Sequence, residues 1–400
     1  MDKVRIGIVG CGRISTLHAP GYLMHPHAEL AACCDINRTK AEAWAVQFGV
    51  GKVHSSFEDM LADPDIDAVE IITPHDTHCS MVEAAAEASK HVSVQKPMAM
   101  DLSECDRMIA ATAKAEVTFK VFENFVFYPP YRKAKELMDA GEIGEPLAIR
   151  IKLNSGGPAF GWPIPLTAWA WRFHRDRCGG GPLIWDDGYH KFSIARYFMG
   201  EVEKVFAWIA QTDMLPIIQG MLADPQALAT AAADPEDMAE ALKMLVGPDG
   251  NLQPLVIDAP AVIVWKYRGA DKFGVWDAMS SFDMEIWSEY YATDERVEIT
   301  GTKGVIWVNQ CTGRLQNTPP VILYRKGETI GFENIPSGWE TSFEDSARHF
   351  VDCLLSGGQI DPVLTGESGR EVTRFAIAAH LSARQGREVT LDEVGPHDRP

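Results

Sequence analysis

A short apolar strand that runs into a glycine-rich turn constrains the fold of this chain more than any other stretch. Residues Arg5 to Val9 are largely apolar, Gly10 and Gly12 follow with G-x-G spacing, and Ser15 is the third small residue. The first glycine permits a tight turn, the second lets the backbone approach a pyrophosphate, and the small third residue lets the next helix pack closely. The N–H groups at the start of that helix then face an anion. The stretch predicts a strand–turn–helix unit for a dinucleotide.

A carboxylate in the expected place strengthens this prediction. The strand Glu29–Cys34 ends in Asp35, where a dinucleotide-binding unit needs an acceptor for the adenosine ribose hydroxyls. Asp35 would repel a 2′-phosphate, so NAD is the predicted cofactor. Arg38 offers a guanidinium to such a phosphate, which keeps NADP as the alternative. An ordinary strand–helix–strand unit with a solvated Asp35 is the other interpretation of the same residues.

The first third of the chain alternates between strand and helix signals. Such alternation is typical of a parallel, doubly wound sheet, in which ligands bind at the carboxyl ends of the strands. The predicted strands are Arg5–Val9, Glu29–Cys34, Ala68–Ile72, His91–Val94 and Thr118–Phe122, and the predicted helices are Thr39–Phe48, Ser56–Leu61, His78–Ser89, Leu102–Ala115 and one that starts near Ile14. The loops after these strands should line one crevice.

Strand signals dominate after Pro129-Pro130 and a helix over Tyr131–Ala140. The runs Leu147–Leu153, Val202–Ala210, Val262–Tyr267, Met284–Trp287, Arg296–Ile299, Val305–Val308 and Val321–Tyr324 predict a second, large and mainly antiparallel open sheet. The Ala-rich segment over 213–254 predicts a helical insertion. Two further helices are predicted near the C-terminus, over Ser342–Leu355 and Gly369–Ala383. The expected fold class is α/β: a Rossmann domain followed by an α/β domain.

Composition narrows the partners and the compartment. A formal net charge of −19 argues against nucleic acid and anionic membranes, which both require a basic face. No apolar run reaches about eighteen residues, and the N-terminus lacks the apolar segment of a signal peptide. The eight cysteines form no C-x-x-C pair. We therefore expect a cytoplasmic protein with reduced thiols and no metal site.

Lys96 follows the predicted strand His91–Val94, so it should emerge at the crevice. Pro97 comes next and can take a cis peptide bond. A lysine is usually a solvated surface charge. Lys96, however, stands in an otherwise uncharged stretch at the carboxyl end of a strand, beside the predicted dinucleotide.

A second group of candidate residues follows a run of three glycines at 179–181. Asp186 and His190 are four residues apart, and an apolar helical pattern continues from His190 to Phe198. On the first turns of one helix, the two side chains would share a face. A carboxylate beside an imidazole orients the ring for proton transfer near pH 7. The alternative is a buried structural histidine at a helix N-terminus.

Taken together, these motifs resemble the Gfo/Idh/MocA oxidoreductases, a family that includes glucose–fructose oxidoreductase and inositol dehydrogenase. The matches cover nearly the whole chain. They are Gly10-Cys11-Gly12-Arg13-Ile14-Ser15, Thr73-Pro74-x-x-x-His78, Gln95-Lys96-Pro97, Gly141-Glu142-Ile143-Gly144, Trp171-Arg172, Asp186-x-Gly188-x-His190, Ile299-Thr300-Gly301-Thr302-Lys303-Gly304 and Ser382-Ala383-Arg384.

The resemblance implies an NAD(P)-binding Rossmann domain over 1–124 and a substrate-binding, oligomerising domain over 125–400. It implies Lys96, Asp186 and His190 as the catalytic trio of a dehydrogenase that oxidises or reduces sugars, polyols and related cyclic hydroxy compounds. The implied cofactor contacts are Gly10, Cys11, Gly12, Arg13, Ile14, Asp35, Ile36, Arg38, Thr73, Pro74, His75, His78, Gln95 and Lys96; the implied substrate contacts are Lys96, Asn124, Trp171, Arg172, Asp186 and His190.

Four features depart from the family pattern. Gln95 replaces the usual Glu, which removes a charge partner of Lys96. Val126 stands where an Arg often follows Asn124, and Ser193 stands where an Asp is common after the histidine. The insertion over 213–254 is longer than the family core requires.

Two other functions remain open from the sequence. A minority of relatives cleave glycosidic bonds through a transient oxidation of the sugar. A nucleotide-binding regulatory protein without activity is the other alternative, although it would not need the catalytic trio. An open sheet face also predicts a homodimer or homotetramer. Tryptophans around the glycine run could stack on a sugar ring or belong to the core: Trp162, Trp169, Trp171 and Trp185.

Overall fold

The computed structural model describes residues 3–156, 164–216, 219, 235–247, 250–281, 283–309, 313 and 315–400. The chain forms two compact units. Unit 1 comprises Met1–Phe127, Glu340–Arg374 and Gly395–Asp398, and unit 2 comprises Tyr128–Trp339, Phe375–Val394 and Arg399–Pro400. A single boundary after residue 124 does not follow these units, and the assignment of separate roles to 1–124 and 125–400 stays a prediction.

Unit 1 is built on a six-stranded parallel sheet, which confirms the predicted Rossmann fold. The strand order is β3-β2-β1-β4-β5-β6, the doubly wound order in which the chain reverses direction beside β1. The strands are β1 (Val4–Val9), β2 (Ala28–Cys34), β3 (Val53–His54), β4 (Ala68–Ile71), β5 (His91–Gln95) and β6 (Phe119–Phe122).

Helices connect these strands, and local signals set their ends. Side chains of Asn37, Ser56 and Asp101 accept N–H bonds at helix starts, and Gly49 ends a helix at φ +69°. The helices are α1 (Ser15–Met24), α2 (Arg38–Phe48), α3 (Phe57–Leu61), α4 (His78–Glu87), α5 (Leu102–Lys114) and, from late in the chain, α13 (Glu340–Leu355).

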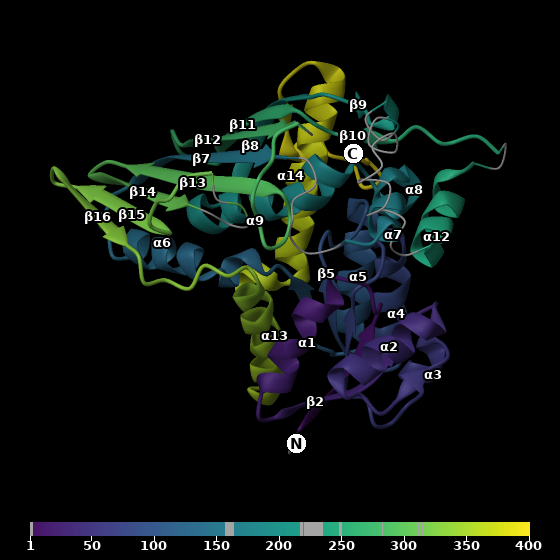
Figure 1. Ribbon diagram of the computed structural model, residues 1–400. Helices are drawn as coiled ribbons and strands as arrows, with labels where there is room; N and C mark the ends of the chain where they lie inside the picture. The colour runs from purple at the N-terminus through teal and green to yellow at the C-terminus, as the bar shows by residue number, and fades with distance from the viewer. Residues whose placement is uncertain are drawn as a thin grey trace. The chain divides into compact units, whose positions relative to one another are not determined.

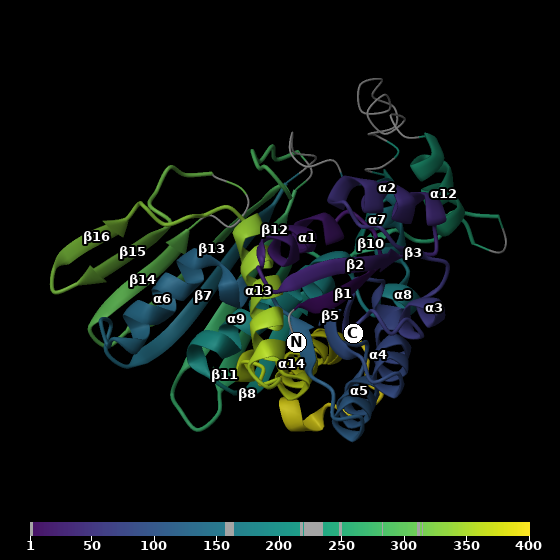
Figure 2. The same cartoon turned by 90° about the horizontal axis from the view of Figure 1, so that it is seen from below.

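Residues far apart in sequence meet where α13 packs on α1 (Figures 1 and 2). Gly21 makes this close packing possible, because a Cβ there would lie 2.5 Å from the carbonyl oxygen of Glu344 and 2.7 Å from the Cβ of Ala347. Unit 1 therefore needs the late helix to complete its core, a contact that no local pattern in the sequence announces.

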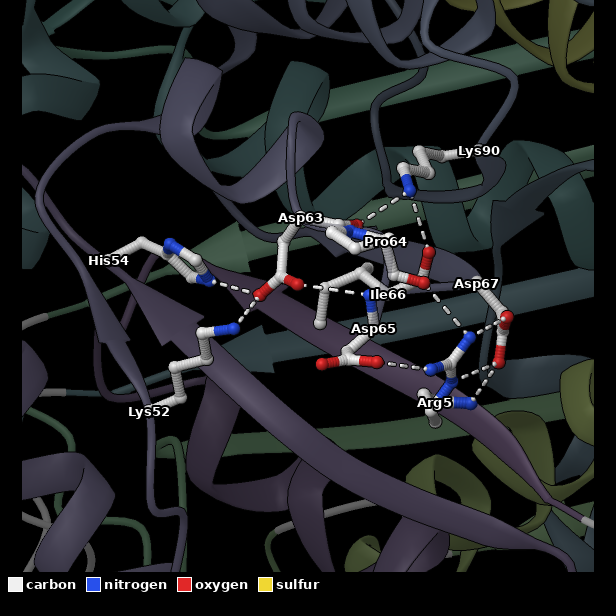
Figure 3. Close-up of polar contacts among 9 residues, drawn as sticks. All are labelled: Arg5, Lys52, His54, Asp63, Pro64, Asp65, Ile66, Asp67 and Lys90. Carbon is white, nitrogen blue, oxygen red and sulfur yellow. Dashed lines mark hydrogen bonds and ion pairs between the residues drawn. The ribbon is translucent and has the colours of Figure 1, made fainter.

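Ion pairs and carbonyl contacts fix the connection between α3 and β4 (Figure 3). The guanidinium of Arg5 bonds to Asp67 at 2.9 Å and to Asp65 at 2.8 Å, and Lys90 Nζ donates to the carbonyls of Asp63 and Ile66 at 2.9 and 2.8 Å. Exposed pairs stabilise little individually, but this set ties β1 and the α4–β5 turn to one loop.

Unit 2 is built on a nine-stranded sheet in the order β16-β15-β14-β13-β7-β12-β11-β8-β17, and Figure 2 shows the first five side by side. Among the described strands of this sheet only β7 and β12 pair in parallel, so it is mainly antiparallel, as predicted. The strands are β7 (Pro146–Ser155), β8 (Val202–Ile209), β11 (Ala261–Tyr267), β12 (Phe273–Ser280), β13 (Thr293–Gly301), β14 (Gly304–Asn309), β15 (Val321–Arg325), β16 (Glu328–Phe332) and β17 (Val389–Thr390).

Two differences from the predicted strands have physical causes. The predicted strand Met284–Trp287 is wrong: the segment is a loop that buries Ile286 and leaves Trp287 69% exposed, so a single packed side chain produced the apparent alternation. Strand β12 was not predicted because Gly274 interrupts its pattern. The Trp265 indole of β11 packs there, 2.0 Å from where a Cβ would stand.

Helices cover one face of this sheet in unit 2 (Figure 1). Helices α6 (Pro129–Asp139) and α9 (Gly188–Met199) contact the strands, and Phe375 of α14 (Gly366–Gln385) stacks edge-on against Trp265. On the opposite face, which we call the outer face, the register aligns apolar and charged side chains. They are Phe206, Trp208, Val262, Val264, Phe273, Val275, Arg150, Lys152, Arg296, Glu298, Trp307 and Tyr324.

Residues 217–218, 220–234 and 248–249 of the predicted insertion over 213–254 lie outside the described residues. Within the part that is described, β9 (Thr212–Asp213) pairs with β10 (Val256–Ile257), and α12 (Pro235–Leu245) contacts α7 (Leu166–Ala170). Among all described residues, no helix is long and apolar enough to cross a membrane.

Candidate active site

The two glycines of the turn after β1 differ in what surrounds them. Gly10 has φ +92°, and a Cβ there would lie 2.3 Å from the carbonyl oxygen of Ile72, so the turn itself requires glycine. Gly12 is exposed, and a Cβ there would meet nothing within 4 Å. The protein alone does not require glycine at position 12. Open backbone at this point fits the close approach of a dinucleotide pyrophosphate.

Asp35 ties this turn to the loop after β2. Its carboxylate accepts from the backbone N–H of Cys11 and of Asn37, each at 2.8 Å. A carboxylate has about four acceptor positions, so two bonds leave capacity for ribose hydroxyls. Arg38 pairs with Glu42 at 2.7 Å on the surface of α2, and Ile36 is fully exposed.

His78 connects the loops that follow β4 and β5. Its Nε2 lies 2.9 Å from the carbonyl oxygen of Thr73, and its Nδ1 lies 3.0 Å from that of Pro97, which follows a cis peptide bond. Burial, reinforced by the neighbouring His75, lowers the pKa of His78 to about 4. A neutral ring donates to only one of the two carbonyls at a time. The buried imidazole of His78 thus contacts both loops.

Gln95 and Lys96 stand at the carboxyl end of β5, and Asn124 follows β6. The Gln95 side chain is 8% exposed and accepts from the Lys96 backbone N–H at 2.7 Å. Asn124 is buried and donates from Nδ2 to Ser342 Oγ at 2.7 Å. The predicted cofactor residues of unit 1 are thereby gathered at the carboxyl edge of one parallel sheet.

In unit 2, Asp186 and His190 belong to two kinds of helix. The sequence favours a single helix for both, but residues Pro182–Asp187 form a π-helix (η4) and α9 starts at Gly188. Both side chains are 4% exposed. The Asp186 carboxylate accepts from Arg172 Nε at 2.5 Å, and the Arg172 guanidinium stacks on Trp171 with 4.5 Å to the ring centroid.

The charges around Asp186 also affect its neighbours. Burial would lower the pKa of Arg172, but the carboxylate of Asp186 outweighs this effect and raises that pKa. Burial raises the pKa of the Tyr291 phenol, which stays neutral. Asp186 is therefore a charge-paired carboxylate that a fixed guanidinium orients.

A second buried carboxylate holds the start of the π-helix. Asp258 is 2% exposed and accepts from the N–H groups of Leu183, Ile184 and Trp185 at 2.8, 2.9 and 2.9 Å. Gly181 is required beside it, because a Cβ there would lie 2.1 Å from the Asp258 carboxyl carbon. Part of the glycine run thus gives Asp258 access to the backbone that carries Asp186.

A third buried group fixes α9 to the sheet beside His190. Lys191 Nζ lies 2.7 Å from Asp187 Oδ2 and 2.8 Å from Glu295 Oε2 on β13, and Tyr131 Oη donates to Glu295 Oε1 at 2.6 Å. The two carboxylates outweigh the effect of burial and raise the pKa of Lys191, so the ammonium is charged.

The tryptophans near the glycine run separate into core and surface residues. Trp185 is fully buried and donates to the Cys178 carbonyl at 2.7 Å, which makes it a core residue. Trp169 is 38% exposed and meets Tyr291 edge-on, and Tyr291 also meets Trp339. Trp162 lies outside the described residues. An aromatic cluster of Trp169, Tyr291 and Trp339 therefore accompanies Arg172.

Sequence reasoning missed the residues that support these positions. Asp258 stands in a loop with no motif, and Glu295 lies in a strand where its charge suggests exposure. Their partners come from distant parts of the chain, so no spacing rule could reveal them. The available signal was the run of three glycines just before the D-x-G-x-H motif. Such a run indicates that another group lies close to the backbone there, but it does not identify that group.

Two family models match the chain in sequence. The model described as an oxidoreductase family with an NAD-binding Rossmann fold matches residues 4–123, and the GFO/IDH/MocA C-terminal domain model matches residues 131–307. Together they cover most of the chain and agree with the two sheets described above.

Named relatives align over almost their whole length. A myo-inositol 2-dehydrogenase of Thermotoga maritima is 30% identical over 394 residues, which is 98% of this chain and 99% of that protein. A scyllo-inositol 2-dehydrogenase (NAD(+)) of Bacillus subtilis is 27% identical over 98% of this chain and 97% of that protein. The solved structure of a levoglucosan dehydrogenase with NADH and levoglucosan has a TM-score of 0.75 at 20% identity, covering 98% of this chain and all of that one, a likeness of fold.

Proposed function

Because this chain belongs to the Gfo/Idh/MocA family of NAD-binding oxidoreductases, we propose that it transfers a hydride between nicotinamide and a secondary alcohol carbon of a sugar, cyclic polyol or glycoside. The observation that carries the proposal is a buried Asp186, oriented by Arg172, four residues before a buried His190. The inositol dehydrogenase names of two full-length relatives support the substrate class.

Each residue of the trio has a separate task in the oxidation direction. Bound NAD supplies the hydride acceptor at nicotinamide C4. His190 takes the hydroxyl proton as general base. Lys96, as a cation, stabilises the developing alkoxide. Asp186, paired with Arg172, orients His190 and helps to hold a substrate hydroxyl, and Asn124, Trp171 and Arg172 are the further substrate contacts in this proposal.

The remaining cofactor contacts follow from unit 1. The turn residues Gly10, Cys11, Gly12, Arg13 and Ile14 would hold the pyrophosphate and Asp35 the adenosine ribose. The loop residues Ile36, Arg38, Thr73, Pro74, His75 and His78, with Gln95 and Lys96, complete the proposed set. The open backbone at Gly12 and the two N–H bonds that fix Asp35 support this assignment.

A screen for NADH formation tests the activity. Purified protein and NAD would be incubated with inositols, aldoses, anhydrosugars and glycosides, and the absorbance of NADH would be followed. We expect NADH with at least one class of cyclic hydroxy compound. NAD binding without NADH formation across all classes would contradict a dehydrogenase.

The cofactor preference is a separate prediction. Asp35 would repel a 2′-phosphate, and Arg38 is already paired with Glu42, so we expect kcat/KM to favour NAD over NADP by about tenfold or more. Arg38→Ala should leave this ratio nearly unchanged, because the Arg38 guanidinium is paired with Glu42 and not with a cofactor phosphate. A preference for NADP that Arg38→Ala abolishes would contradict the prediction.

We also propose that a second copy of the chain covers the outer face of the unit 2 sheet. Trp208 is 64% exposed there and Phe273 48% exposed, while Arg150 and Glu298 form a 2.7 Å ion pair farther along. Apolar strands that flank a row of both charges suit a two-fold contact, in which the same patch meets itself.

Light scattering tests this assembly. At micromolar concentration we expect the mass of two or four chains, and Trp208→Glu should lower the mass by placing a charge in the contact. Val46→Glu is the control, since Val46 is 85% exposed on α2 of unit 1. A single-chain mass for the unmodified protein would contradict the proposal.

The state of the cysteines supports a compartment. Seven cysteines that the structure describes are free and buried: Cys11, Cys33, Cys34, Cys79, Cys105, Cys178 and Cys353. Free thiols suit a reducing compartment, and we propose that the protein acts in the cytoplasm.

A further inference from the structure

We infer that Gln95, together with the buried His18 and Glu70, is a positioning residue for Lys96. The inference rests on the role of Lys96 in the proposed function. Gln95 is also the residue that departs from the Glu usual in the family, so its contacts bear on how this chain holds its catalytic lysine. All four residues belong to unit 1: Gln95 ends β5 and Lys96 follows it, while His18 lies on α1 and Glu70 on β4.

The three side chains form a continuous chain of contacts. Gln95 Oε1 accepts from the Lys96 backbone N–H at 2.7 Å, and Gln95 Nε2 lies 3.0 Å from His18 Nε2. His18 Nδ1 lies 3.2 Å from Glu70 Oε1, with both side chains fully buried. The other oxygen of Glu70 accepts from the Tyr22 hydroxyl. Solvent therefore reaches none of the inner contacts.

The hydrogen-bond donors and acceptors of Lys96, Gln95 and His18 allow one arrangement. A backbone N–H only donates, so the oxygen of the Gln95 amide must face Lys96 and its NH₂ group must face His18. His18 Nε2 must then accept and carries no proton. The ring proton sits on Nδ1 and faces the Glu70 carboxylate. The backbone of Lys96 thus fixes the amide orientation, and the amide fixes the tautomer of a neutral His18.

The surroundings favour the same neutral ring. Burial lowers the pKa of His18, and the ammonium of Lys120 on β6 lowers it further, while Glu70 opposes both. Lys120 itself is fully buried and faces Ser346, with its Nζ 2.9 Å from the Oγ. Phe122 stacks on the imidazole with ring centroids 3.9 Å apart, and Phe343 of α13 meets it at 5.2 Å. The charged groups that act on His18 are Glu70 and Lys120, and the titratable Tyr22 bonds to Glu70.

This arrangement explains why an amide serves at position 95. A carboxylate there would offer only acceptors, so His18 would need protons on both nitrogens to lie between two carboxylates. In this chain Gln95 keeps His18 neutral and still holds the Lys96 N–H. The Gln95 amide therefore restrains the backbone from which the Lys96 side chain extends. The amide is itself held by His18, which contacts Glu70.

The test compares three variants of the full chain with NAD present: Gln95→Leu, Gln95→Glu and the control Gln47→Leu, whose side chain is exposed on α2. Gln95→Leu should lower kcat about tenfold, the worth of one lost hydrogen bond, with KM for the substrate within about twofold. Gln47→Leu should change neither constant.

Gln95→Glu keeps the acceptor for Lys96 and so should recover most of the lost kcat where His18 is protonated. As the pH rises and His18 loses its second proton, kcat of Gln95→Glu should fall. The unmodified protein, in which His18 is already neutral, should not show this fall. Nitrogen-15 NMR of histidine-labelled protein should show one protonated ring nitrogen on His18 in the unmodified protein and two in Gln95→Glu at neutral pH.

The outcomes separate the inference from the function it rests on. Unchanged kcat in Gln95→Leu, while Lys96→Ala abolishes turnover, would overturn the positioning role and leave the proposed function intact. A His18 protonated on Nε2 in the unmodified protein would overturn the donor–acceptor chain whatever the kinetics show. Full turnover in Lys96→Ala would instead remove the proposed role of Lys96.

Discussion

His190→Asn lowers kcat by about two to four powers of ten near pH 7, the usual worth of a positioned acid or base, if His190 takes the hydroxyl proton. The affinity for NAD should stay nearly unchanged, because the proposed dinucleotide contacts all belong to unit 1 and His190 belongs to unit 2. Steady-state kinetics on a substrate from the NADH screen, with NAD titrations by fluorescence, measure both quantities.

Lys96→Ala should lower kcat at least as much, since it removes the cation proposed to stabilise the alkoxide. Lys96→Arg should recover little, because a planar guanidinium does not present the compact charge of an ammonium. The double variant Lys96→Ala with His190→Asn should cost less than the sum of the two single changes, as both act on one hydroxyl.

Asp186→Asn and a surface histidine serve as comparisons for these variants. Asp186→Asn keeps an oxygen that can accept from Arg172, so its loss of kcat should be smaller than that of His190→Asn. His27→Asn alters an exposed histidine and should leave kcat unchanged. If His190→Asn retained most of its activity, the D-x-G-x-H motif would report the fold and not the mechanism.

The second large effect that we expect is a loss of stability in the variant Lys191→Met. It leaves the carboxylate of Glu295, with a side-chain exposure of 2%, without its cation, and removes a partner of Asp187. Removing one member of a buried ion pair typically costs about 3–5 kcal/mol, and we expect a loss of that size in the free energy of unfolding. Denaturant titrations followed by tryptophan fluorescence measure it.

Two further variants isolate the cause. Lys191→Met combined with Glu295→Gln should recover much of the loss, because an amide needs no cation and still accepts from Tyr131. Lys266→Met breaks an exposed pair with Asp271 and should cost less than about 1 kcal/mol. Equal losses for Lys191→Met and Lys266→Met would show that burial does not set the strength of the Lys191 pair.

The sequence predicted unit 1 almost strand by strand, because its signals are local. Apolar runs and the glycine at position 49 each act within a few neighbouring residues. The packing of α13 on α1 was beyond prediction, since Gly21 looks like any helical glycine until Glu344 and Ala347 are placed against it. In unit 2, β12 was missed for the same reason: Gly274 leaves room for the Trp265 indole, and this contact exists only in the folded sheet.

The candidate site was predictable as motifs and not as a network. The G-x-G turn, Asp35, Lys96 and the D-x-G-x-H motif stand out in one dimension. The groups that hold them, Asp258, Glu295 and His18, come from other elements and have ordinary surroundings in sequence. Their roles depend on burial and on which donor faces which acceptor, and those relations exist only once the chain has folded.

Hydride transfer itself provides the most direct test of the central claim. A cyclic polyol or sugar that yields NADH would be labelled with deuterium at the carbon that is oxidised, and the product cofactor would be examined by mass spectrometry and NMR. We predict deuterium at nicotinamide C4, one per ketone formed, and none with His190→Asn or Lys96→Ala at matched times. Release of an aglycone with no net NADH, or bound NAD that never acquires deuterium, would contradict the account.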